Sequence, residues 1–91
     1  MFTDKHQFLT FPNKEDRRTY WIGRLVQTKT ATRVDLFNVL PAKTLGMVVD
    51  LEDKNDGSAY VLVVRWATGD TFPCYQYSVY SDEGGKSDDK V

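Results

Sequence analysis

The sequence has little cysteine, histidine or proline: one, one and three residues in a chain of 91. Because Cys74 has no partner in the chain, no internal disulfide can form, and nothing indicates an oxidising compartment. No stretch approaches the roughly 20 apolar residues that cross a bilayer. The first eleven residues also lack the continuous apolar segment of a signal peptide. The sequence therefore predicts a cytoplasmic protein with no membrane partner.

Residues that carry enzyme chemistry are also scarce. His6 and Cys74 are far apart in the sequence, and neither is surrounded by a motif of Cys–His enzymes. No glycine-rich phosphate-binding loop precedes a helix. The acidic stretch from Asp50 to Asp56 offers oxygen ligands, but it lacks the glycine and the bidentate glutamate at the spacing of a calcium-binding loop. We therefore predict no enzyme activity, no metal site and no cofactor.

The composition is that of one small globular domain, with 41% hydrophobic and 27% charged residues. The net charge is −1, but its distribution is uneven. Residues 1–46 hold eight basic and four acidic side chains, whereas residues 47–91 hold four basic and nine acidic ones. The first half could therefore present a basic face.

Alternating apolar and polar residues predict strands in the second half of the chain. Two strands are expected at 46–52 and 60–66, joined as an antiparallel hairpin by the turn-forming residues 55–57. Gly69 is expected in the left-handed conformation at the next turn. Pro73 cannot donate to a ladder, so its strand belongs at an edge of the sheet. Trp66 is expected in the core, because it follows the inward-facing alternation of its strand.

The first half of the chain allows two interpretations. Residues 20–26 alternate like a first strand, and residues 28–45 then form a long excursion with an apolar middle. Upstream, Asn13 followed by Asp16 is typical of a helix start. Equally, residues 7–11 could pair with residues 19–23 as a hairpin. We favour the hairpin, because Tyr20 and its neighbours are β-formers and Gly23 would weaken a helix.

The order of these segments resembles the Src homology 3-like small β-barrel, in particular short barrels of tailed bacteriophages. Those barrels have a Gly-x-Leu-Val strand, a Gly-x-Val-Val-Asp strand, and a valine-rich strand that ends in Trp and is followed by Gly-Asp and an aromatic-rich end. The resemblance covers residues 20–81. The matching positions are Gly23, Leu25, Val26, Gly46, Val48, Val49, Asp50, Val61, Val63, Trp66, Gly69, Asp70 and Tyr77.

This resemblance implies an all-β fold, a small five-stranded barrel over residues 20–81. Residues 1–19 would be an N-terminal extension, and residues 82–91 a disordered acidic tail. Members of this fold serve as protein-binding, nucleic-acid-binding and structural modules. We expect a non-enzymatic protein-interaction module, a phage accessory protein acting on a host or virion protein in the host cytoplasm, and a monomer or weak homo-oligomer.

Two segments contain more apolar residues than regular strands need: the excursion and the aromatic end. We predict a partner-binding groove between them, because in barrels of this type the first loop and the closing segment are neighbours. Phe37, Tyr75 and Tyr77 would be its anchors, with Arg33 and Asp70 at the rim. The alternative is that these aromatic residues simply cap the ends of the barrel.

Nucleic acid is the rival partner. Phosphates would be bound by basic side chains of the first half, and Tyr20 and Trp21 could stack on bases. The sequence pI of about 5.7 argues against this function, because dedicated nucleic-acid-binding domains usually exceed a pI of about 9. The residues of this alternative are Arg17, Arg18, Arg24, Lys29 and Arg33.

Overall fold

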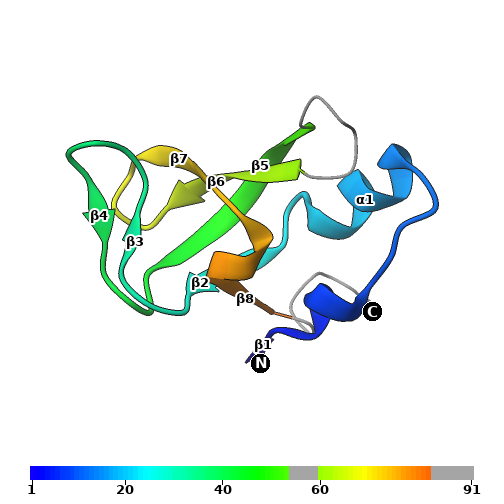
Figure 1. Ribbon diagram of the computed structural model, residues 1–91, viewed down its shortest axis with the longest axis horizontal. Helices are drawn as coiled ribbons and strands as arrows, with labels where there is room; N and C mark the ends of the chain where they lie inside the picture. Colours follow the sequence, from blue (N-terminus) through cyan, green and yellow to red (C-terminus); the bar gives the residue numbers. More distant parts are fainter. Residues whose placement is uncertain (54–59, 83–91) are drawn as a thin grey trace.

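The computed structural model describes residues 1–53 and 60–82 (Figure 1). Its elements are β1 (Phe2–Thr3), η1 (Lys5–Phe8), α1 (Lys14–Trp21), β2 (Leu25–Thr28), β3 (Thr32–Arg33), β4 (Val39–Leu40), β5 (Leu45–Asp53), β6 (Tyr60–Trp66), β7 (Thr71–Cys74), η2 (Gln76–Ser78) and β8 (Val79–Asp82). The elements η1 and η2 are short 3-10 helices. Strands dominate, and the predicted all-β class is confirmed.

Six strands form one antiparallel sheet, in the order β1-β8-β2-β5-β6-β7. The strands β3 and β4 form a separate hairpin, which projects at the end of the molecule opposite α1 (Figure 1). The large sheet curls strongly, like half of a barrel. The predicted count of five strands is too low, because the excursion between β2 and β5 contains its own hairpin and β1 extends the sheet beyond β8.

The strands β5 and β6 form the hairpin that the alternating pattern predicted. Their register begins with Gly46 opposite Trp66 and continues to the end of β5, with one bulge after Val48. Trp66 is only 2% exposed, which confirms its predicted place in the core. The turn expected at residues 55–57 lies outside the described residues.

The backbone geometry explains why two glycines and one proline stand where they do. A Cβ on Gly46 would lie 2.5 Å from Cγ1 of Val64 and 2.7 Å from Cε3 of Trp66, so no larger residue fits there without displacement. Gly69 has a φ of +98° in the turn between β6 and β7, which confirms its predicted left-handed conformation. Pro73 lies on β7, the edge strand of the sheet, as predicted.

The predicted strand over residues 20–26 is wrong up to Arg24. Residues 14–21 form α1, and the strand begins only at Leu25. The side chain of Asn13 caps the helix by accepting a hydrogen bond of 2.9 Å from the backbone N–H of Asp16. The helix ends before Gly23, whose φ is +89°. The favoured N-terminal hairpin is therefore corrected to the helix, because a good cap and the burial of Trp21 outweigh local β propensity.

The N-terminal residues contact the end of the sheet directly. β1 pairs with β8, and the N-terminal amine lies 2.9 Å from a carboxylate oxygen of Asp82. His6, in η1, is 1% exposed. The segment 1–19 thus extends the edge of the sheet and packs against it. Asp82 is the last residue of β8, and residues 83–91 lie outside the described part of the chain.

The core lies between the curled sheet and the segments that cover it. It combines residues of α1, of β2 and of β4 to β8. Neither α1 nor the 3-10 helices within residues 1–53 and 60–82 are long and apolar enough to cross a membrane. The core residues are Trp21, Val26, Leu40, Val48, Leu51, Tyr60, Leu62, Val64, Trp66, Cys74 and Val79.

Candidate functional site

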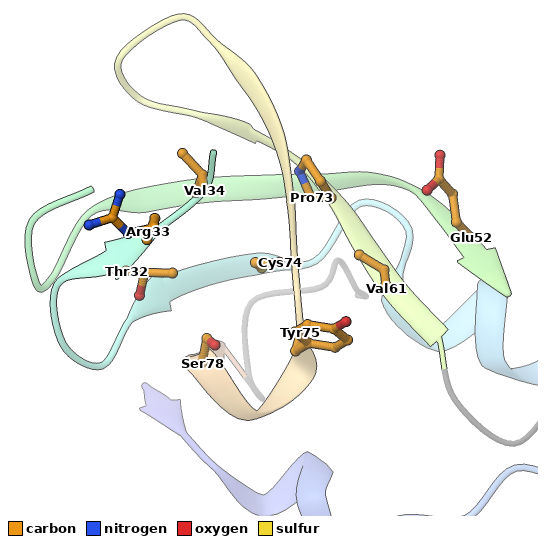
Figure 2. A pocket seen from close by; sticks show the side chains of 9 residues that line it. All are labelled: Thr32, Arg33, Val34, Glu52, Val61, Pro73, Cys74, Tyr75 and Ser78. Carbon is orange, nitrogen blue, oxygen red and sulfur yellow. The ribbon is translucent and has the colours of Figure 1, made fainter. Parts of the chain in front are cut away.

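A groove of about 250 Å³ lies between the base of the β3–β4 hairpin and the closing segment β7–η2. In Figure 2 the residues of the hairpin lie on one side of β7 and those of β5 and β6 on the other, with Cys74 between them. Its walls are mixed, with apolar and polar side chains and one charged residue of each sign. Its lining residues are Thr32, Arg33, Val34, Glu52, Val61, Pro73, Cys74, Tyr75 and Ser78.

Two backbone hydrogen bonds fix the closing segment at the groove. The backbone N–H of Ser78 donates to the carbonyl of Tyr75 over 3.0 Å and closes the turn η2. The backbone N–H of Lys29 donates to the carbonyl of Ser78, also over 3.0 Å. This second bond ties the start of the excursion to the closing segment. Tyr75 precedes the turn in an extended conformation and remains 51% exposed.

Cys74 contributes an apolar surface to the groove. Cys74 is 6% exposed and belongs to the hydrophobic core, as expected for an unpaired cysteine in a strand. Burial raises the pKa of its thiol to about 12. The thiol therefore stays protonated at neutral pH, and a nucleophilic thiolate is not formed there to any useful extent.

The structure brings two of the five predicted binding residues to this groove, Arg33 and Tyr75. Phe37 lies at the tip of the β3–β4 hairpin and is 90% exposed. Tyr77 borders a different hollow, between η2 and the N-terminal segment. Asp70 lies in the turn between β6 and β7. None of these three lines the groove.

Sequence reasoning named two of the nine lining residues and missed the other seven, among them Val34, Glu52 and Val61. Val61 could have been found, because the period of β6 places it on the face opposite Trp66. Val34 and Glu52 carry no such signal, since their neighbourhood depends on where the excursion packs.

The basic residues of the nucleic-acid alternative all contact other parts of the protein. Arg24 is 7% exposed, and its guanidinium donates to the carbonyls of Tyr20 and Asp82. Arg17 lies 4.4 Å from the centre of the Tyr60 ring. Arg18 forms an ion pair with Asp50, and Nζ of Lys29 lies 4.0 Å from a carboxylate oxygen of Asp4. The guanidinium of Arg33 donates to the carbonyl of Leu36.

His6, the single imidazole, is enclosed by the closing segment. Its Nε2 lies 2.8 Å from the carbonyl oxygen of Gln76, which can only accept, so Nε2 carries the proton. Its Nδ1 lies 3.0 Å from Oγ of Ser81, and its ring meets Trp21 edge-on at 5.0 Å between centroids. These contacts make His6 a structural link. Within residues 1–53 and 60–82, no three His, Cys, Asp or Glu side chains gather as a metal site would require.

Comparisons with protein-family models, with curated proteins and with solved structures found no match to this chain. The function has to be inferred from the fold and from the groove.

Proposed function

We propose that this protein is a non-enzymatic protein-interaction module of the Src homology 3-like class, which holds a segment of a partner protein in the groove. The strongly curled antiparallel sheet supports a small barrel-like fold. The long excursion after the first strand departs from the resemblance, since it forms the extra hairpin β3–β4. The resemblance to phage barrels further suggests an accessory protein that acts on a host or virion protein in the host cytoplasm.

The observation that carries the proposal is the half-exposed Tyr75 beside a groove with a partly apolar lining. Tyrosine offers a large rigid surface and a hydroxyl group, and it is enriched among residues that dominate binding energy. The apolar Val34 and the buried Val61 also line the groove. Arg33 and Glu52 also line the groove, and the guanidinium of Arg33 donates to the carbonyl of Leu36.

Replacing Tyr75 by Ala is expected to weaken partner binding by about 2 kcal/mol, or roughly thirty-fold, because it removes the central aromatic contact. The measurement is affinity capture from the source cell with the wild-type protein and Tyr75→Ala in parallel, followed by titration calorimetry with the purified partner. Leu25→Ala is the matched control, since Leu25 is 38% exposed on β2 and does not line the groove. Equal capture by the wild type and Tyr75→Ala would contradict the groove.

The rival function is nucleic-acid binding by the basic first half. We expect no retention of random duplex or single-stranded DNA at physiological salt, because the five basic side chains already contact the protein. Fluorescence anisotropy with labelled DNA measures this directly. Micromolar affinity would favour the rival. The slope of log K against log salt concentration should then be about −0.9 for each phosphate contacted.

A further inference from the structure

The strand β7 forms one edge of the large sheet. Among the described residues it pairs with β6 alone, since it stands last in the strand order. The hairpin β3–β4 is a separate sheet, so its strands leave the outer side of β7 unpaired although both segments line the groove. In Figure 2 Val61 of β6 lies on one side of β7, and the hairpin residues lie on the other, which is the unpaired side. The groove therefore runs beside an open edge of the sheet.

The register shows which backbone groups point out from this edge. Thr71 lies opposite Arg65. Next to this pair, the backbone N–H of Trp66 donates to the carbonyl of Asp70 over 2.8 Å. This bond makes Arg65 and Thr71 a non-hydrogen-bonded pair, and in an antiparallel ladder the bonding direction alternates from residue to residue. The residues on either side of Pro73 therefore bond to β6, whereas the backbone groups of Thr71 and Pro73 point away from it.

These outward groups have no partner in the described part of the chain. Within residues 1–53 and 60–82, no hydrogen bond reaches the backbone N–H or carbonyl of Thr71, or the carbonyl of Pro73. Both residues are exposed. A row of exposed backbone donors and acceptors is the surface to which an extended chain adds as a further strand. The edge can therefore recognise the backbone of an extended segment.

The groove supplies room for the side chains of such a strand. Pro73 lies opposite Val63, so it shares a sheet face with Val63 and Val61, away from the core residues Leu62 and Val64. A residue added opposite Pro73 would place its side chain on this face. The volume of about 250 Å³ suits one or two side chains and lies below the roughly 300–1,000 Å³ of small-molecule sites. The groove thus fits a chain segment better than a small molecule.

Pro73 also determines which chain can add to this edge. Proline has no backbone N–H, so at this position the edge accepts a hydrogen bond but cannot return one. A pairing of two β7 edges would bring together two strands that both lack this donor. A segment without proline opposite Pro73 supplies its own N–H and has no such deficit. The edge therefore favours a segment of a different protein over a second copy of this chain.

We propose that the partner segment binds as an additional strand on the outer edge of β7, with its backbone bonded to Thr71 and Pro73 and alternate side chains in the groove. This inference rests on the proposed function, since it assigns a conformation to the segment that the groove holds. The sheet would then grow from β7 toward the β3–β4 hairpin (Figure 2). Main-chain hydrogen bonds supply affinity in this mode, and the side chains that enter the groove supply selectivity.

A backbone scan of a bound peptide tests the added strand. The probe is selected on the immobilised 91-residue chain from phage that display random peptides of about 12 residues, longer than a usual strand. The tightest peptide is then synthesised with one N-methyl group at each position in turn. N-methylation removes a backbone donor, so every second position in the bound stretch should lose at least about tenfold in affinity. The positions between them are the control and should change by less than about threefold.

Thr71→Pro tests the edge from the protein side. The N–H of Thr71 does not bond to β6, so proline removes an outward donor without breaking the ladder. We expect the peptide to bind at least about tenfold more weakly. The matched control is Thr71→Ala, which removes the same exposed side chain but keeps the N–H, and it should bind within about threefold of the wild type. Circular dichroism checks that both variants fold.

Amide exchange of the wild-type protein gives the same information if Thr71→Pro does not fold. With the peptide at about ten times its Kd, about one tenth of the protein is free, so exchange of the Thr71 amide should slow about tenfold. The amide of Glu15, in the first turn of α1, is the control and should exchange at an unchanged rate.

The strand inference is overturned if no selected peptide binds with a Kd below about 1 mM, if the N-methyl scan does not alternate, or if the Thr71 amide stays unprotected. The proposed function has a separate readout in Tyr75. If partner capture depends on Tyr75 but the scan does not alternate, the groove holds a segment in another conformation, and only the strand inference fails. If capture is independent of Tyr75, the proposed function fails, whatever the peptides show.

Discussion

Replacing Trp21 by Ala is expected to lower the free energy of unfolding by about 3–5 kcal/mol, the largest effect among the point substitutions considered. Trp21 is completely buried, and its indole N–H donates to Oη of Tyr60 over 3.1 Å. Its ring also meets the rings of His6 and Tyr20 at about 5 Å. The substitution leaves a large cavity and removes a buried donor. Urea denaturation followed by circular dichroism measures the loss, and the melting temperature should fall by on the order of 15 °C.

The matched control for this prediction is Phe37→Ala. It also removes an aromatic side chain, but one that is 90% exposed, so the expected change is within about 0.5 kcal/mol. If both variants lost a similarly large free energy of unfolding, the loss could not be assigned to the burial of Trp21. A stable Trp21→Ala variant would show that Trp21 is not in the core, and the helix would then have to be placed elsewhere.

His6→Ala is expected to lower the free energy of unfolding by about 2–4 kcal/mol. The imidazole bonds the carbonyl of Gln76 and the hydroxyl of Ser81, and it is 1% exposed. Alanine removes both hydrogen bonds and opens a cavity beside Trp21. The change would loosen η1 from η2 and β8. Equilibrium denaturation measures the loss, and hydrogen exchange should locate it at β1 and β8.

Lys5→Ala is the control for this second prediction. Lys5 belongs to the same 3-10 helix, but it is exposed, so its loss should change stability by less than about 0.5 kcal/mol. If His6→Ala is equally mild, the N-terminal segment does not contribute to the fold. In that case residues 1–19 would behave as a separable extension of the barrel.

The competition between helix and strand at residues 14–21 could not be decided from the sequence. Both signals are present: Asn13 and Asp16 indicate a helix start, whereas Tyr20 and Trp21 favour a strand. The outcome depends on burial of Trp21 against His6 and Tyr60, which lie on other elements of the fold. A local pattern does not contain these contacts, so it could not weigh them against propensity.

The groove could be predicted only in part. The surplus of aromatic and apolar residues in the excursion and the closing segment was visible, and these two segments do meet. The sequence did not separate Tyr75, which lines the groove, from Phe37 and Tyr77, which do not. All three side chains are large and aromatic, and only the path of the backbone determines which of them lines the groove.

The sequence by itself determined the elements whose signals are local. The alternation in β5 and β6, the left-handed turn at Gly69 and the edge position of Pro73 follow from side-chain period and backbone sterics within a few residues. Only the tertiary structure decided that Trp21 belongs to a buried helix and that β1 pairs with β8. It also decided that the excursion forms a hairpin whose base shares a groove with Tyr75. Each of these arrangements depends on contacts between residues far apart in the chain, and such contacts form only when the whole sheet closes around its core.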